Sequence, residues 1–222
     1  MALRLIVLLL LCSAGLSAQI TDSVVIVDRF QLGVVAGMMN HEVDFTPTTN
    51  VQEVLGTNFG VALRYFDNKL VGFQAELTFA NAGWTEEIDP DFSTPYERRT
   101  RYAELLILTQ LSIGQGAVQP LLQAGPYLSF PLGDEETIPA EYVEPDSPAQ
   151  REYYNYKLPF RVNYGAQVGA GLNLELGPLT IQAEGRFLVG FSDLIKTGTT
   201  VAATSRREGL GGKIGLFWAL RR

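Results

Sequence analysis

Thiol chemistry is almost absent from this chain. Its 222 residues contain one cysteine, Cys12, which lies inside an apolar N-terminal stretch. If that stretch is removed on export, the mature chain has no thiol, which excludes disulfide bonds, thiolate metal ligands and a cysteine nucleophile. A lipoprotein signal needs a small residue directly before the cysteine, and Leu11 stands there. We therefore expect no lipidation and no cysteine chemistry.

Histidine, positive charge and long apolar runs are also scarce. His41 is the only histidine, and 17 Lys and Arg face 24 Asp and Glu, for a formal net charge of -7. An acidic balance argues against nucleic acid as a partner, since phosphates are bound by basic residues. After residue 18 no apolar run reaches the roughly 18 residues of a transmembrane helix. No cofactor motif is present, and we expect no cofactor.

The N-terminus has the three parts of a secretory signal peptide. Arg4 supplies the positive charge, residues 5–11 are apolar, and residues 13–18 form a zone of mostly small residues. The apolar run is too short to anchor the chain, because a membrane-spanning helix needs about 20 residues. We predict residues 1–18 as a signal peptide, cleaved after Ala18, and residues 19–222 as one domain.

The remaining sequence shows apolar residues at every second position, in segments of about ten residues. In residues 160–176 the even positions are apolar and the odd positions are glycine, polar or charged. This period of two is typical of half-buried strands. Eight strands are predicted, at residues 30–39, 58–65, 71–80, 102–113, 118–132, 160–176, 179–191 and 210–220.

The connections between these segments alternate in length. Residues 67–69, 114–117 and 177–178 form short turns, whereas the other connections are long: 40–57, 84–100, 133–159 and 192–207. Outer-membrane barrels have an even strand number, short periplasmic turns and longer external loops. The sequence therefore predicts an all-β fold, an eight-stranded antiparallel up-and-down transmembrane β-barrel with short periplasmic turns and long extracellular loops.

The content of the two parities favours a membrane barrel over a soluble one. The apolar parity carries no ionisable residue, and on the lipid side an Arg or Lys would cost about 2–4 kcal/mol at the bilayer midplane. The polar parity is rich in glycine, and inward charges need partners. A secreted soluble barrel that binds apolar ligands is the alternative. The predicted lumen charge network consists of Arg64, Glu76, Glu104, Arg161, Glu184, Arg186 and Lys213.

Two local features carry further predictions. Pro126 falls in the middle of the fifth strand, where a closed barrel would lose a ladder hydrogen bond, so we expect a β-bulge there. Aromatic residues gather near the external strand ends, and we expect an interfacial girdle; an extracellular ligand patch is the alternative. These aromatic residues are Trp84, Tyr102, Phe130, Tyr153, Tyr154, Tyr156 and Phe160.

Four stretches together resemble the PorT-type outer-membrane β-barrel family: residues 63–77, 102–108, 123–127 and 165–173. The resemblance covers nearly the whole mature chain. It implies an outer-membrane location, and a role in a secretion complex only by analogy with one namesake. The last strand is also similar to the assembly signal of bacterial barrels at Lys213, Gly215, Trp218 and Leu220, although the chain continues to Arg222 instead of ending on an aromatic residue.

These observations leave several functions open. We expect a non-enzymatic barrel with a closed or narrow lumen, whose acidic external loops serve surface interaction, envelope integrity or a secretion complex. One alternative is a narrow porin for small solutes or ions. Another is a surface enzyme acting on lipid or peptide, with His41 in the first external loop as base. The acidic residues 134–146 could also bind calcium, but they lack the spacing of a known calcium loop.

The expected partners follow from this location. They are outer-membrane lipid and lipopolysaccharide, the barrel-assembly machinery, and an envelope or secretion protein.

Overall fold

The alternating segments fold into eight antiparallel strands. The computed structural model describes residues 30–68, 70–114, 116–144, 153–155, 161–195, 200 and 202–220. No helix in this part of the chain is long and apolar enough to cross a membrane. The strands are β1 (Phe30–Thr46), β2 (Val51–Phe66), β3 (Val71–Glu86), β4 (Tyr96–Ser112), β5 (Val118–Thr137), β6 (Asn163–Leu176), β7 (Leu179–Asp193) and β8 (Thr204–Ala219).

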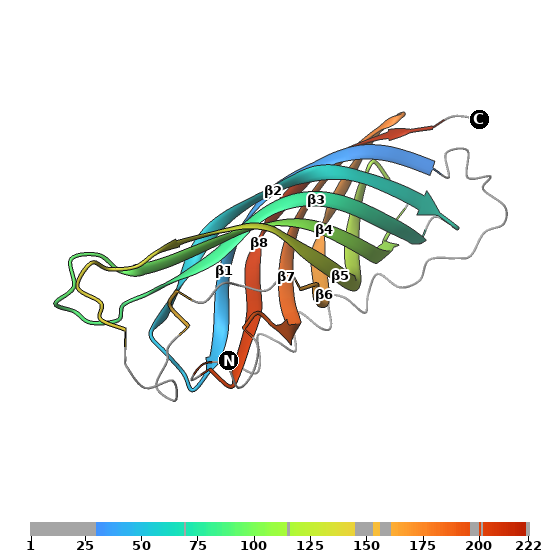
Figure 1. Ribbon diagram of the computed structural model, residues 1–222. Helices are drawn as coiled ribbons and strands as arrows, with labels where there is room; N and C mark the ends of the chain where they lie inside the picture. The colour runs from blue at the N-terminus through green and yellow to red at the C-terminus, as the bar shows by residue number, and fades with distance from the viewer. Residues whose placement is uncertain are drawn as a thin grey trace, which may run out of the picture.

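Each strand pairs with its neighbours in sequence, and β8 pairs with β1 to close the barrel (Figure 1). This confirms the predicted fold class. The short turns lie at one end, together with the start of β1 and the end of β8. In the β6–β7 turn Gly177 has a φ of 66°, which a glycine adopts without strain. In the β2–β3 turn the Asn68 Oδ1 accepts hydrogen bonds from the backbone N–H of Leu70 and Val71, at 2.9 and 2.8 Å.

The strands run further toward the loop end than the sequence predicts. The predicted loop 40–57 shrinks to four residues, because β1 continues to Thr46 and β2 begins at Val51. β3, β4 and β5 reach furthest in this direction (Figure 1), with the last β3–β4 pair at Glu86 and Tyr96. The predicted signal peptide, residues 1–18, lies outside the described residues.

The bulge predicted at Pro126 is wrong. The β4–β5 pairing lapses between Leu106↔Tyr127 and Thr109↔Ala124 and resumes in the same register. β5 therefore accommodates the missing N–H of Pro126 by omitting pairs, without an added residue. The register shift of β5 lies elsewhere, opposite Arg101 and Tyr102 of β4, whose partners are Gly133 and Pro131.

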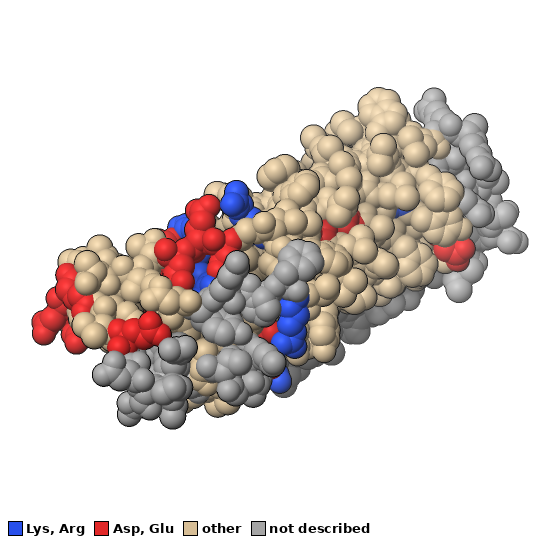
Figure 2. All heavy atoms as spheres, in the orientation of Figure 1, with Lys and Arg blue, Asp and Glu red and all other residues tan. Residues whose placement is uncertain are grey.

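The apolar parity faces outward on the half of the barrel that carries the short turns. Large apolar side chains there are about half exposed, such as Leu32 at 51% and Ile107 at 54%. On β1 the outward row stays uncharged from Phe30 to Met38. Nine residues at about 3.3 Å each, tilted by about 40°, cover about 23 Å, close to the height of a lipid-facing band. We call this zone the apolar band; Figure 2 shows that its surface is largely uncharged and that acidic residues gather beyond it.

Candidate functional site

The lumen inside the apolar band is built around one carboxylate, Glu76 of β3. Arg186 of β7 donates to both of its oxygens, and Lys213 of β8 pairs with it as well. Arg186 also donates from Nε to Glu184 Oε1, at 2.8 Å. All four side chains are buried. Two cations thus share two carboxylates in a space away from solvent, where an unpaired charge would be costly.

Arg64 of β2 lies nearer to the short turns and has neutral partners. Its Nε donates to Gln74 Oε1 at 2.7 Å, and its guanidinium carbon lies 3.5 Å from the centre of the Phe217 ring. Gly33 and Gly215 make room for that ring, since a Cβ on either would fall 2.5 Å from a Phe217 ring atom. Small inward residues therefore allow a buried Arg to stack on an aromatic face.

A second carboxylate, Glu104 of β4, lies further toward the loop end. It pairs with Arg207 of β8 and accepts a hydrogen bond from the Ser129 hydroxyl at 2.7 Å. The Arg207 guanidinium carbon lies 4.8 Å from the centre of the Tyr102 ring and 5.3 Å from that of Tyr127. Tyrosine rings and one carboxylate thus surround the cation, which crosses the lumen at this level.

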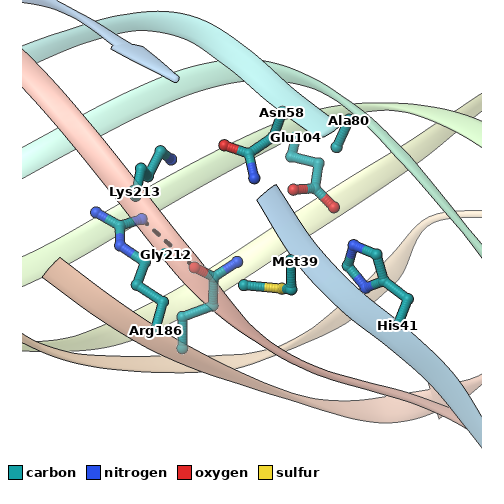
Figure 3. Close-up of a pocket in the computed structure, with 9 residues that line it drawn as sticks. Met39, His41, Asn58, Ala80, Glu104, Arg186, Gly212 and Lys213 are labelled. Carbon is teal, nitrogen blue, oxygen red and sulfur yellow. Dashed lines mark hydrogen bonds between the residues drawn. The ribbon is translucent and has the colours of Figure 1, made fainter. Parts of the chain in front are cut away.

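His41 is part of the lumen and not of a loop. The prediction of a loop histidine is wrong, because β1 extends past it and turns its ring inward, leaving it 3% exposed. Figure 3 shows it beside Met39 and Glu104, with Arg186 and Lys213 further along the lumen. The cavity that these residues line has about 10 Å³ for the centre of a water molecule, which is room for roughly one water.

Beyond the apolar band the lumen becomes aromatic. Phe45, Trp84, Tyr96, Tyr153 and Tyr154 are each at most 5% exposed and form one cluster with nearby aliphatic residues. The rings of Phe45 and Tyr153 are stacked, with centres 4.5 Å apart and an interplanar angle of 4°. We call this set the aromatic plug. Tyr153 and Tyr154 come from the β5–β6 connection, so this loop contributes to the closure of the external end.

The predicted aromatic girdle is therefore wrong for four of its members. Trp84, Tyr102, Tyr153 and Tyr154 are buried inside the barrel. Beyond the apolar band the wall faces water, so the rings of Trp84, Tyr153 and Tyr154 turn away from it, whereas Tyr102, at the edge of the band, lies against the Arg207 guanidinium. Phe130 is half-buried. Tyr156 and Phe160 lie outside the described residues.

A buried carboxylate, Glu86, reaches the aromatic plug from the end of β3. The Tyr153 hydroxyl donates to it. Burial raises the pKa of the Glu86 carboxyl above its usual value, although the hydrogen bond from Tyr153 opposes this shift. Burial also raises the pKa of the Tyr153 hydroxyl. Burial at this site therefore disfavours the charged form of Glu86 relative to a carboxyl group in water.

The acidic segment 134–146 is partly paired. Asp134 and Glu136 both contact the buried Arg98 guanidinium, and Glu136 also accepts from the Tyr96 hydroxyl at 2.6 Å. Asp146 lies outside the described residues. Among the residues that are described, no group of three or more His, Cys, Asp or Glu could hold a metal ion. These acids anchor β5 to β4 through Arg98.

The other predicted site residues divide into those that face the lumen and those that are exposed. Six members of the predicted charge network are buried in the lumen, whereas Arg161 is exposed, two residues before β6 begins at Asn163. The predicted strand starts too early, which put Arg161 on the inward parity. In the predicted assembly signal Lys213 and Gly215 face inward, and Trp218 and Leu220 face outward at 57% and 48% exposure.

Sequence reasoning missed Arg207 and Arg98. Arg207 stands in the run Arg206-Arg207-Glu208, where three adjacent charges hide the alternation of β8. Arg98 stands in a similar run, Glu97-Arg98-Arg99. The only available signal was the parity of each residue relative to its strand, extended past the predicted strand end.

Comparison with known proteins agrees with this architecture. Residues 17–196 match the family described as outer membrane protein beta-barrel domain. The chain belongs to this family. No curated protein sequence matches it. Among solved structures it is similar to the outer membrane protein OprG from Pseudomonas aeruginosa, with a TM-score of 0.55 and 10% identity over 88% of this chain and 98% of that chain.

Two other barrels are more distant in shape. Neisserial surface protein A has a TM-score of 0.43 and 13% identity, covering 83% of this chain and 96% of that chain. Ail of Yersinia pestis, in complex with a heparin analogue, has a TM-score of 0.39 and 13% identity, covering 86% and 99%. The likeness to OprG shows the fold alone. Family membership and the outward apolar band place this barrel in the outer membrane, and the soluble alternative is wrong.

Proposed function

We propose that this chain is a non-enzymatic outer-membrane barrel with a closed lumen, which presents its external half as a rigid acidic platform to a partner at the cell surface. The observation that carries the proposal is the filling of the lumen at successive levels. The levels centre on Arg64, on Glu76, on Glu104 and on the aromatic plug. An eight-stranded barrel encloses only enough room for side chains to fill.

The pairing of these charges supports a structural role over an ion path. Glu76 and Glu104 each contact at least one buried cation, and Arg186 bridges two carboxylates. Moving an ion through would require these pairs to open inside a space with little water. A buried pair that loses one partner costs about 3–5 kcal/mol. This cost favours a lumen that stays closed.

The platform is the projecting part of β3, β4 and β5 with the β3–β4 loop. Its acidic residues are exposed at the tip, including Glu87, Asp89 and Asp91, and Figure 2 shows acidic side chains gathered at this end. Arg98 ties β4 to β5 underneath. A rigid acidic surface fits a basic partner protein, and the resemblance to the PorT-type family supports a place beside a secretion complex.

A planar-bilayer recording tests the closed lumen. We expect the purified protein to give no large, stable conductance step. Large and stable steps in the wild type would overturn the proposal and favour a narrow porin. In that case Arg64→Ala and Arg186→Ala should change the conductance, whereas in a closed barrel they should change only stability.

An activity assay tests the non-enzymatic part. We expect the purified barrel to hydrolyse neither phospholipid nor peptide, since His41 is buried in the lumen. Hydrolysis that is lost in His41→Ala but kept in the control variant Gln52→Ala, at an exposed position of β2, would contradict it. Heat-modifiable migration on gels checks that each variant is folded.

A further inference from the structure

A groove crosses the outer wall of the barrel at the loop-side edge of the apolar band. Its apolar floor includes Phe59 of β2, Phe79 of β3 and Leu132 of β5, and Arg101 of β4 and Asn81 of β3 lie along it. The three apolar side chains are 61%, 51% and 56% exposed. The groove offers about 320 Å³ to the centres of water-sized molecules. It is therefore much larger than the cavity inside the lumen.

The register shift between β4 and β5 shapes this groove. Arg101 pairs with Gly133 and Tyr102 with Pro131, so Leu132 is an extra residue on β5. A bulge of this kind twists the strand and re-aims its side chains. The Arg101 guanidinium lies over Gly133, where a Cβ would come within 2.8 Å of its Nη2. Glycine at this position lets the cation lie flat against the wall.

The first charge outside the apolar band differs from wall to wall. On the outward parity of β4, counted from the short turn, the first ionisable residue is Arg101. On β1 and β8 the corresponding residues are Glu42 and Glu208, which face each other in the register. An anionic headgroup at this depth is therefore attracted to the β4 wall and repelled from the β1–β8 wall.

The present partner of Arg101 can be exchanged. Glu135 lies 3.5 Å from Arg101, and the two side chains are 73% and 64% exposed. Exposed ion pairs of this kind contribute little. Glu135 also pairs in register with Arg99, one step further from the membrane than Arg101. The cation thus lies on the membrane side of the pair and the acid on the water side.

We propose that this groove binds a phosphate-bearing lipid of the outer leaflet. The acyl chain lies along Phe59 and Phe79, and the phosphate contacts the Arg101 guanidinium. Arginine can hold a phosphate with two parallel hydrogen bonds, and the acyl chain of the lipid covers the exposed apolar side chains of the groove floor. The proposal depends on the membrane location of this wall and not on whether the lumen conducts.

Native mass spectrometry of the full mature barrel tests the proposal, with bisphosphorylated lipid A as the probe. We expect the wild type to retain the lipid and Arg101→Gln to retain it about tenfold less, because one bidentate contact is lost. The matched control is Arg206→Gln, an exposed Arg of β8 that lies 4.0 Å from Asp193, which should change retention less than about twofold. Lipid A without phosphate should bind the wild type and Arg101→Gln equally.

A second variant separates a binding role from a structural one. Glu135→Gln removes the competing acid, so lipid retention should rise above the wild type, whereas a purely structural Arg101–Glu135 pair predicts no gain. Phe59→Ala should weaken the retention of lipid A with phosphate and of lipid A without phosphate to the same extent. Equal loss in Arg101→Gln and Arg206→Gln would mean general attraction to a basic wall and would overturn the site. Unchanged lipid retention in Arg101→Gln would overturn it as well, provided that heat-modifiable migration shows that the variant is folded.

Discussion

The part of the barrel inside the apolar band and the part beyond it use one alternation in opposite senses. On β1, Gln31 faces the lumen and Leu32 faces outward, whereas further along the same strand Phe45 faces the lumen and Asp44 faces outward. The backbone parity is the same throughout. What changes is the medium outside the wall, from hydrocarbon to water.

The difference shows which interactions can hold each part together. Lipid is as apolar as a core side chain, so burying apolar groups in the lumen gains little there. Hydrogen-bonded ion pairs fill that space, as at Glu76 and Arg186. Beyond the band, water surrounds the wall, and the hydrophobic effect drives aromatic rings inward. The external part therefore has a core like that of a soluble protein.

The largest expected effect comes from breaking the ionic interior. Glu76→Ala leaves Lys213 without its carboxylate and removes one of two from Arg186. We expect a loss of about 3–5 kcal/mol, because an uncompensated buried charge remains. Urea unfolding of the barrel in lipid vesicles, followed by tryptophan fluorescence, measures it.

Two variants control this result. Glu97→Ala removes a half-buried acid of the outer wall, paired with the exposed Arg99, and should change stability by less than about 0.5 kcal/mol. The double variant Glu76→Gln with Lys213→Met removes one charge of each sign and should recover part of the lost stability. If Glu76→Ala and Glu97→Ala cost the same, the ionic interior does not hold the barrel together.

The next effect comes from breaking the aromatic plug. Phe45→Ala removes the ring stacked on Tyr153 and packed near Trp84. We expect a cost of about 3 kcal/mol, as for a large core residue, confined to the external part. Hydrogen exchange should speed up for external amides of β1 and β3 while amides within the apolar band keep their protection.

The outward Phe79 is the matched control for Phe45. Its ring is 51% exposed on the membrane side, so lipid replaces it in Phe79→Ala and the cost should be smaller. Equal effects of the two variants, or a loss of protection throughout the barrel in Phe45→Ala, would show that the two parts are not held independently.

Much of the fold could be predicted because parity is a local signal. The even positions of residues 160–176 are apolar, and the short turns at 177–178 and 67–69 fix the hairpins. The strand ends could not be predicted in the same way. From residue 42 onward β1 keeps its alternation but inverts its polarity, with Val43 inside and Glu42 outside. A prediction that always places apolar residues on the outside therefore ends the strand before residue 42.

The site was predictable only as a set of inward charges. Parity places Glu76 and Lys213 on inward rows, but 137 positions separate them in sequence, and their contact depends on how the closed barrel brings β3 and β8 to face across the lumen. Residues 134–136 are three consecutive acids with no alternation, so the sequence does not indicate which of them pair with Arg98 and which with Arg101.

The smallest expected effect concerns pH and the aromatic plug. Because the pKa of Glu86 is raised in the folded state, the folded plug favours the protonated acid. Below the unfolded pKa of about 4.5 Glu86 is neutral in both states and costs nothing. As pH rises through the raised pKa, the folded state must bury a charge or hold a proton, and stability is lost. Glu86→Gln should remove this loss, with a gain at neutral pH below about 1 kcal/mol.

Hydrogen exchange of the external amides, from about pH 4 to 8, measures this difference between Glu86→Gln and the wild type. Comparing the two proteins cancels the pH dependence that both share. Glu87→Gln, at the exposed neighbouring position, should follow the wild type at every pH. If Glu86→Gln also runs parallel to the wild type, the charged form of Glu86 is as well accommodated as the neutral one, and the external part tolerates buried charge as the lumen within the apolar band does.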